Sequence, residues 1–437
     1  MNYYLGIDFG TSGARSAVID SEGVIKSQGR YLFEDLKDNN LINSWEKGLW
    51  ALLGGVSGEI KRQIKGIAIN GTSSTVMLCD SIGKPIDSPL LYNYVCDAKV
   101  VEQIQQIAPP NHIVLSATSS LAKLVWMSQQ AYFSEAEYFL HQADWLGFLM
   151  HGKLGISDYH NALKLGYDVE TLKYPDWLLQ WLQEKLQIPV KLPQVLAPGT
   201  VVGKLKMDVA AKFDFPQDCL ISAGTTDSIA AFFASGANKP GEAVTSLGST
   251  LVLKLLSSTR VEDSRYGIYS HRFPSFNQEN QEALWLAGGA SNTGGAVLKK
   301  FFTNSELENL SHQIDPKQTS ELDYYPLTQV GDRFPINDPN LEPRLEPRPD
   351  NDVEFLHGLL ESIARIEAQG YQLLQKLGAD SLTRVYTAGG GAKNHTWEAI
   401  RERCLGVNIA HSNNTDAAYG TALLVMKGNR EMRRIGD

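Results

Sequence analysis

Short apolar runs that end in tight polar turns recur along this chain. Residues 3–9 and 14–20 are two such runs, and the four residues between them, 10–13, combine two glycines with two small hydroxyl side chains. Two apolar runs joined by so short a turn predict a β-hairpin. A third strand is expected at 23–30, so the chain opens with three strands in succession.

The second half repeats this arrangement. Residues 243–247 form an apolar run, 248–250 form a Gly-Ser-Thr turn, and 251–256 form the returning run. Two strand–turn–strand units, one near the start of each half, predict a duplicated domain. A further expected strand, 384–388, runs into three consecutive glycines at 389–391.

Between the strands, apolar residues that repeat every 3.6 positions predict helices. The longest helix is expected at 354–377, and the helix expected at 43–64 has Asn43 as a candidate N-cap. Residues 330–351 are rich in Pro, Asp, Asn and Arg and are expected to form a surface loop. Alternating strands and helices are typical of an α/β fold. The other expected helices are 97–107, 120–130, 134–151, 177–187, 228–236, 296–303, 394–405 and 416–427. The other expected strands are 64–70, 219–223 and 284–288, the last followed by a turn that is bracketed by Gly288, Gly289, Gly294 and Gly295.

A length of 437 residues exceeds what one compact core usually supports and predicts two domains. We place the boundary at Asp227, so that 1–227 form the N-terminal domain and 228–437 the C-terminal domain. The composition, 43% hydrophobic and 20% charged, is that of a soluble globular protein. A net charge of −9 gives no support for binding to nucleic acid or to a membrane surface.

Cysteine usage predicts a reducing, cytoplasmic setting. Cys79, Cys96, Cys219 and Cys404 lie far apart and form no CxxC pair, which argues against a zinc site or a disulfide framework. Cys79 and Cys219 are expected in the core. No apolar stretch reaches the ~18 residues that span a bilayer, and no targeting peptide precedes the first strand. The chain is expected to be a monomer or a homodimer, with neither nucleic acid nor membrane as a partner.

The turn at 10–13 has the composition of a phosphate-binding site. Backbone N–H groups and small hydroxyls in a tight turn can bind an anion, and Gly10 and Gly13 permit positive φ and close approach. Asp8, where the preceding strand ends, is placed to hold a hydrated Mg²⁺ that bridges phosphates. An ordinary hairpin is the alternative for each turn alone. Together, the two turns and the glycine run predict a nucleotide-dependent phosphotransferase.

Asp227 has two interpretations. It follows Gly224 at a strand end and precedes a helix. As an N-cap, its carboxylate would accept amide protons of the first helical turn. As a general base, it would orient an attacking hydroxyl and accept its proton late in a loose phosphoryl-transfer transition state. Both roles can hold together.

The glycines at 389–391 leave a flat surface between a strand and a helix. A purine can lie on such a surface, or a phosphate can approach the helix N-terminus. A tight turn is the alternative, although it rarely needs three glycines. The run has neither the Lys-Ser/Thr end of a P-loop nor the spacing of a dinucleotide-binding fold. Asn394 and Trp397 could border an adenine, with core packing the favoured role for Trp397.

These motifs, in this order and spacing, resemble the FGGY carbohydrate kinases along nearly the whole chain. The resemblance implies a two-domain, actin-like α/β fold of the ribonuclease-H-like type. It places ATP in an interdomain cleft and the sugar mainly on the N-terminal domain. The matching stretches are Gly6–Ser12, Asp158-Tyr159 with Asn161-Ala162, Gly224–Asp227, Ser246–Thr250, Pro326 with Gly331–Arg333, and Gly389–Asn394 with Trp397.

The same resemblance assigns roles to individual residues. Asp227 would be the general base, and Asp8 would lie beside the metal and the sugar, with Thr11 at the transferred phosphate. The implied cofactors are ATP and Mg²⁺. The implied ATP-binding residues are Gly10, Thr11, Ser12, Gly248, Ser249, Thr250, Gly390, Gly391 and Asn394.

The turn after the strand at 64–70 bears on which sugar is bound. Xylulose kinases of the family carry Met-His-Gly there, whereas residues 71–75 of this chain are Gly-Thr-Ser-Ser-Thr and resemble the family's ribulose kinases. Small hydroxyls suit hydrogen bonding to sugar OH groups, which makes Ser73 and Ser74 candidate sugar contacts. A solvated turn is the alternative.

Asp97 is a further candidate sugar contact, although Cys96 and Ala98 beside it depart from the family pattern, as does His160, where serine is usual. The short chain most resembles the compact xylulose kinase-like proteins of cyanobacteria and plants that are associated with D-ribulose. We therefore predict an ATP-dependent kinase that converts D-ribulose to D-ribulose 5-phosphate. The alternatives are a kinase for D-xylulose, L-ribulose or a polyol, and an actin-like ATP-binding sugar sensor with little transfer activity.

Overall fold

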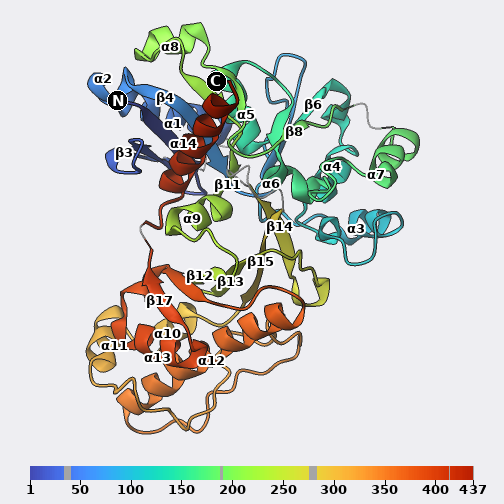
Figure 1. Ribbon diagram of the computed structural model, residues 1–437. Helices are drawn as coiled ribbons and strands as arrows, with labels where there is room; N and C mark the ends of the chain where they lie inside the picture. The colour runs from blue at the N-terminus through green and yellow to red at the C-terminus, as the bar shows by residue number, and fades with distance from the viewer. Residues whose placement is uncertain (34–40, 188–189, 275–282, 413, 437) are drawn as a thin grey trace. The chain divides into compact units, whose positions relative to one another are not determined.

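The computed structural model describes residues 1–33, 41–187, 190–274, 283–412 and 414–436 (Figure 1). These residues form two compact units. The first unit holds residues 1–234 together with the C-terminal residues from 416 onward, and the second unit holds most of the chain between them. The division is therefore less simple than one cut at Asp227, because the last helix returns to the first unit.

The first unit is built on a mixed sheet with the order β3-β2-β1-β4-β10-β9, in which β11 also pairs with β4. The first three strands are antiparallel, and β4 runs parallel to β1, β10 and β11. The strand expected at 3–9 is confirmed without a shift. The strands are β1 (Tyr3–Phe9), β2 (Gly13–Ile19), β3 (Ile25–Leu32), β4 (Ile64–Gly71), β9 (Val201–Lys204), β10 (Leu220–Ser222) and β11 (Thr225–Thr226).

Helices cover both faces of this sheet. One face packs on α1, α5 and α8, through an apolar core that includes buried Cys79 and Cys219 as expected. A second core joins α3, α4 and α7 to the hairpin of β5 (Val76–Cys79) and β6 (Tyr138–His141). The helices are α1 (Leu41–Gly55), α2 (Gly58–Lys61), α3 (Ala98–Gln105), α4 (Ser120–Met127), α5 (Gln142–His151), α6 (Tyr159–Ala162), α7 (Asp176–Gln180), α8 (Met207–Phe213), α9 (Asp227–Ser235) and α14 (Ala417–Gly436), and β7 (Ile156–Asp158) pairs with β8 (Gln194–Leu196).

The opposite face of the sheet is covered by α14, drawn in red across the blue N-terminal strands in Figure 1. Two glycines let this helix approach the strands. A Cβ on Gly6 would lie 2.1 Å from the Ala418 carbonyl oxygen, and a Cβ on Gly66 would lie 2.6 Å from Val425. The fit of the helix on these glycines explains why the C-terminal residues belong to the first unit.

Two local predictions in this unit are wrong. Residues 138–141 were expected to be helical but form β6, because their apolar and aromatic side chains pair with β5. The helix itself begins only at Gln142. Asn43 is not an N-cap, since α1 begins at Leu41 and Asn43 lies inside it.

The second unit repeats the strand pattern of the first. Its sheet has the order β14-β15-β13-β12-β16-β17, with β12 antiparallel to β13 and parallel to β16. The duplication expected from the two strand–turn–strand units is therefore confirmed at the level of topology. The elements are β12 (Glu242–Leu247), β13 (Leu251–Ser257), β14 (Tyr269–Phe273), β15 (Leu284–Ser291), β16 (Arg384–Ala388), β17 (Asn408–His411), α10 (Gly295–Phe301), α11 (Asn304–Ser311), α12 (Asp352–Lys376) and α13 (His395–Leu405).

Gly288 and Gly289 lie inside β15 rather than in a turn. A Cβ on Gly289 would lie 2.5 Å from the Phe334 ring, so this glycine makes room for a side chain of the loop at 330–351. That loop contains no helix or strand, as expected, yet Phe334 is fully buried in the core.

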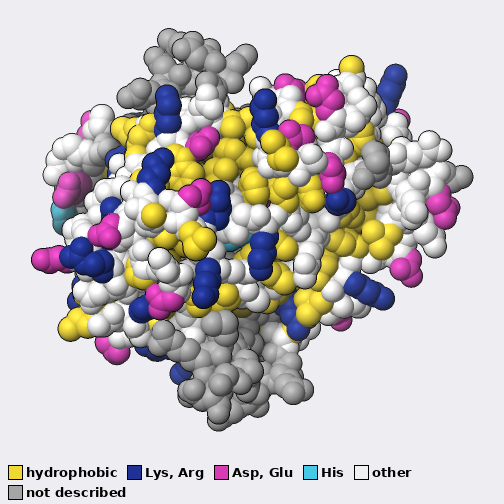
Figure 2. Space-filling model, turned by 90° about the horizontal axis from the view of Figure 1, so that it is seen from above, with side chains coloured by type: hydrophobic (Ala, Val, Ile, Leu, Met, Phe, Trp, Pro, Cys, Tyr) yellow, Lys and Arg dark blue, Asp and Glu magenta, His cyan; other side chains and the backbone are white. Residues whose placement is uncertain are grey.

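On the face in Figure 2, Lys and Arg side chains lie interspersed with Asp and Glu. Among the described residues, no helix combines the length and apolar character needed to cross a bilayer.

Candidate active site

Three parallel strands of the first sheet, β1, β4 and β11, end side by side. Asp8 on β1 lies opposite Asn70 on β4, and Asn70 lies opposite Thr225 on β11. The chain therefore leaves all three strands at one edge of the sheet. The turn at 10–13, the turn at 72–75 and Asp227 all begin within a few residues of this edge. Polar residues gathered at the carboxyl ends of parallel strands are typical of a ligand site.

The turn at 10–13 exposes its hydroxyl side chains. Thr11 and Ser12 are exposed, and the N–H of Gly10 donates to the Gly13 carbonyl oxygen at 3.0 Å. Neither Gly10 nor Gly13 adopts the positive φ that glycine permits. Gly13 is needed for another reason, because a Cβ there would lie 2.5 Å from the Tyr31 carbonyl oxygen of β3.

Asp8 is a carboxyl group with a strongly perturbed pKa at this edge. Burial, together with the neighbouring carboxylates of Asp227 and Asp416, raises its pKa to about 7 against smaller opposing effects of Arg15 and Asn70. One carboxylate oxygen, Oδ1, is buried without a hydrogen-bond partner in the described part of the chain. The fold therefore holds a carboxylate whose ionised form needs a cation.

A hydrated divalent cation fits these residues. An orphaned buried oxygen on Asp8, with two further carboxylates close enough to shift its pKa, makes a negative site at the strand ends. Within the described ranges, no three metal-ligating side chains lie close enough to share one ion. This donor set suits Mg²⁺, which keeps several waters and binds through one or two carboxylates and substrate phosphates.

Asp227 is the first residue of α9 and is half-buried. Its Oδ1 accepts the Ser228 N–H at 2.6 Å, so the carboxylate is oriented by the start of its own helix. The strand residue before it, Thr226, pairs with Gly71 at the end of β4. This pairing places Asp227 beside the turn at 72–75. A carboxylate so held can accept a proton from a hydroxyl bound at that turn.

The turn at 72–75 uses two of its four hydroxyls internally. Thr72 Oγ1 and Thr75 Oγ1 lie 2.5 Å apart, and the Thr72 N–H donates to Gln142 Oε1 at 3.1 Å. Ser74 adopts a left-handed φ of 62° and its Oγ is buried without a partner among the described residues. Ser73 is half-buried and is the turn hydroxyl most open to a ligand.

Two other residues singled out from the sequence lie differently. Asp97 is exposed at the start of α3, and its side chain forms no cap hydrogen bond. His160 is buried on α6, and its Nδ1 lies 2.7 Å from Thr225 Oγ1. His160 thus contacts the short strand that leads into Asp227.

In the second unit, three glycine-containing turns pack backbone against backbone. The Gly295 N–H donates to the Gly248 carbonyl at 2.9 Å, which joins the β12–β13 turn to the start of α10. Gly389 has a φ of 86°, and a Cβ there would lie 2.6 Å from the Leu247 carbonyl oxygen. Gly390 has no atom within 4 Å of the corresponding position. Such packing leaves a surface of backbone, open at Gly390.

These turns border a pocket of about 760 Å³ that lies wholly within the second unit. The size lies in the range of small-molecule and cofactor sites. Trp397 packs into the core, as favoured, with Nε1 donating to the Leu360 carbonyl oxygen. The pocket is lined by the turn residues 247–249 and 390–391, by α10 and α11, and by the start of α13.

Asn394 lines this pocket, but its amide serves the protein. Oδ1 accepts the Trp397 N–H at 2.9 Å and caps α13, while Nδ2 donates to Ser311 Oγ at 2.8 Å. Of the expected phosphate contacts here, Gly248 and Ser249 line the pocket and Thr250 does not. Lys299 and Lys393 add positive charge to the lining.

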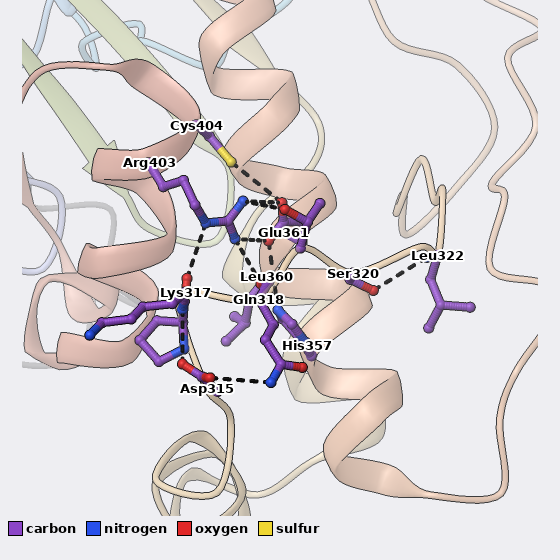
Figure 3. A network of polar contacts seen from close by, with 12 residues as sticks. Asp315, Lys317, Gln318, Ser320, Leu322, His357, Leu360, Glu361, Arg403 and Cys404 are labelled. Carbon is purple, nitrogen blue, oxygen red and sulfur yellow. Dashed lines mark hydrogen bonds and ion pairs between the residues drawn. The ribbon is translucent and has the colours of Figure 1, made fainter.

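An ion pair between Arg403 and the buried carboxylate of Glu361 links α13 to α12 (Figure 3). Arg403 on α13 forms hydrogen bonds of 2.5 and 3.0 Å to Glu361 on α12, whose side chain is 1% exposed. Arg403 also donates to the carbonyls of Pro316 and Gln318. Burial raises the pKa of the neighbouring Cys404 thiol to about 11, so this cysteine stays protonated at neutral pH. The network fixes the segment that follows α11.

Sequence patterns missed two residues at the first site. Asp416 raises the pKa of Asp8, although the two are separated by most of the chain. Gln142 holds Thr72 from α5. The sequence signal that could have indicated Asp416 is the polar segment before α14. In the structure, Asp416 Oδ1 accepts the Ala418 N–H.

Comparison with known proteins gives a consistent result. The FGGY family of carbohydrate kinases matches with its N-terminal domain over residues 3–234 and its C-terminal domain over residues 243–428. A xylulose kinase of Bacillus subtilis (strain 168) is 22% identical over 98% of this chain and 89% of its own length.

Two solved structures have a similar fold. The xylulose kinase from Rhodospirillum rubrum has a TM-score of 0.81 at 18% identity, covering 98% of this chain and 90% of its own. The Plasmodium falciparum glycerol kinase with ADP has a TM-score of 0.81 at 19% identity, covering 99% and 90%. The expected two-domain α/β fold of the ribonuclease-H-like type is confirmed.

Proposed function

The chain belongs to the FGGY family of carbohydrate kinases and is an ATP-dependent sugar kinase, and within that activity we propose that it phosphorylates D-ribulose at O5. The observation that carries the proposal is the turn at 72–75. Its small hydroxyl side chains leave the backbone open to a ketopentose, with Ser73 as the hydroxyl most available to it. Xylulose kinases of the family have bulkier Met and His side chains at this place.

Asp227 is proposed as the general base. It accepts the proton of the sugar O5 hydroxyl while the bond from O5 to the γ-phosphorus forms and the bond from that phosphorus to the β–γ bridging oxygen breaks, which releases ADP. Its fixed orientation at the start of α9 supports this role. Because the transition state is loose, a carboxylate of ordinary basicity is sufficient to take the proton late.

Asp8 is proposed to hold Mg²⁺, through water, with its buried Oδ1 as the supporting observation. The ion supplies charge neutralisation of the phosphates when bound. Thr11, Ser12 and the Gly10 backbone are proposed to bind phosphate oxygens. Ser74 and Asp97 stay weaker candidates for sugar contact, since the Ser74 side chain is buried and Asp97 is exposed at the start of α3.

The nucleoside of ATP is proposed to bind in the pocket of the second unit. Its volume suits a purine nucleoside, and Gly390 presents backbone without side chains. Gly391 and Asn394 border the same space, and Gly248, Ser249 and Thr250 are proposed for the phosphates. Asn394 would act by shape and by holding Ser311, because both ends of its amide are already bonded.

A substrate panel tests the proposal. ADP release is measured with ATP and Mg²⁺ against D-ribulose, D-xylulose, L-ribulose and glycerol, and the phosphorylated carbon is assigned by NMR. We expect the highest kcat/KM with D-ribulose and phosphate at carbon 5. A preference for D-xylulose, its epimer at carbon 3, would favour the second candidate, which the xylulose kinase relatives support over 98% of this chain.

Asp227→Asn separates a kinase from a sugar sensor. We expect a loss of about 10³-fold in kcat, within the range for a general base, with folding intact. Asp208→Asn is the matched control, because Asp208 lies in the first turn of α8 and accepts the next N–H at 2.9 Å as Asp227 does. ADP release that is equal with and without every sugar would refute the kinase proposal. The oligomeric state and the cytoplasmic location stay predictions.

A further inference from the structure

Lys123 is a buried lysine whose Nζ donates to two backbone carbonyls of the described chain. It lies on α4 with its side chain fully inside the first unit, and Nζ donates to the Ser74 carbonyl at 2.7 Å and the Leu91 carbonyl at 2.6 Å. Among the described residues no carboxylate forms an ion pair with it, and the charged or titratable groups that shift its pKa are Cys96 and Lys164. Burial lowers its pKa to about 8.

A buried ammonium without a carboxylate is costly to the fold, and an apolar side chain of the same length would fill the space more cheaply. What the ammonium adds is its two directed bonds. One reaches the turn at 72–75, at the residue with left-handed backbone, Ser74. The other reaches Leu91, next to Tyr92, whose N–H donates to Thr75 Oγ1 at 3.0 Å.

The turn is therefore held from two sides. Gln142 on α5 fixes Thr72, and Lys123 on α4 fixes Ser74. Ser73 lies between these two anchored residues. Its backbone position is set by two helices that are separate in sequence.

We propose that Lys123 is a positioning residue for the sugar, which acts through the Ser74 and Leu91 carbonyls to hold Ser73 in place for the substrate. This inference rests on the proposed sugar-binding role of the turn at 72–75. Lys123 does not touch the sugar. It sets the geometry in which Ser73 and Asp227 meet the same hydroxyl-bearing ligand.

The test is Lys123→Met, which keeps the length of the side chain and removes both bonds. The matched control is Lys61→Met, because Lys61 is 8% exposed and Nζ donates to one carbonyl, Gly54, at 3.0 Å, away from the turn. Kinetics are measured with the best substrate of the sugar panel. We expect KM for the sugar to rise at least tenfold in Lys123→Met, with KM for ATP within twofold, and neither to change in Lys61→Met.

Hydrogen exchange supplies a local readout. Amide protection at Thr75, Val76 and Tyr92 should fall in Lys123→Met while the core of the first sheet stays protected, because these amides bond within the turn and to residue 90. If Lys123→Met does not fold, Lys123→Gln, whose shorter and uncharged side chain keeps an amide NH2 group as a donor, should show a smaller rise in the same KM.

The outcomes are distinct. A sugar KM within twofold of wild type in the folded variant, or an equal rise in both KM values, would overturn the role of Lys123 while leaving the kinase proposal intact. No sugar-dependent ADP release from the wild-type protein would overturn both.

Discussion

Replacing Asp8 by asparagine should stabilise the metal-free protein while it removes activity. In the fold, burial and the charges of Asp227 and Asp416 raise the pKa of Asp8 from 3.8 to about 7. The unfolded chain has no such penalty, so the carboxyl group ionises more readily there. Above pH 7 the folded protein therefore bears the full cost of a buried charge, which a neutral amide of the same shape avoids.

The magnitude follows from the shift. About three pKa units at ~1.36 kcal/mol each give ~4 kcal/mol of unfolding free energy at pH 8. At pH 5 the folded carboxyl is neutral and only the unfolded chain ionises, so the difference falls to about 2 kcal/mol. Below pH 3.8 it approaches zero. The destabilisation caused by Asp8 is thus absent in acid and grows as pH rises from 3.8 to 7.

The assay is urea unfolding with EDTA at pH 5, 6, 7 and 8, followed by tryptophan fluorescence. Asp8→Asn should unfold at higher urea than wild type, by a margin that grows with pH. Asp20→Asn is the control, and it should lower rather than raise the stability. Lys26 and two backbone N–H groups lower the pKa of Asp20, so replacing its carboxylate removes stabilising bonds. Mg²⁺ should stabilise wild type and leave Asp8→Asn nearly unchanged.

Two results would refute this reasoning. If Asp8→Asn were no more stable than wild type at pH 8, burial would not be the source of the perturbed pKa. If the gain were the same at every pH, it would not come from ionisation. Either result would also remove the support for Asp8 as a cation site.

The second unit gives two further predictions. Gly389→Ala should destabilise the protein by about 1–3 kcal/mol and raise KM for ATP, because residue 389 has a φ of 86° and a Cβ there would meet the Leu247 carbonyl. Gly390→Ala is the control: a Cβ at residue 390 lies in open space, so thermal stability should change little. Arg403→Met should lower the urea midpoint by the equivalent of about 2–4 kcal/mol, since it leaves Glu361 buried without its main partner; an unchanged midpoint would show that the ion pair adds nothing.

The sequence predicted features that are set by neighbouring residues. The bounds of β1 and the glycine turns at 248 and 389 follow from apolar runs and glycine content within ten residues, and the structure has them there. The stretch at 138–141 shows the limit of this approach. A short apolar run is compatible with helix or strand, and its pairing with β5, sixty residues earlier, decides between them.

Contacts between residues far apart in the sequence were not predicted, for a related reason. An amphipathic pattern shows that α14 has a buried face, but not which sheet it covers. The feature of the sheet that matches this face is the absence of side chains at Gly6 and Gly66, which makes room for the helix. Asp416 reaches the strand ends only because α14 packs there.

Polar residues near a motif are the hardest to assign from sequence. A side chain that is already hydrogen-bonded within the protein has fewer donors and acceptors available for a ligand. Asn394 was expected at an adenine, yet its amide is committed to Trp397 and Ser311. Thr72 and Thr75 are likewise bonded to each other, and Ser73 is the half-buried hydroxyl that we propose for the sugar. Which side chains of a polar turn face a ligand is therefore decided by the partners that more distant helices supply.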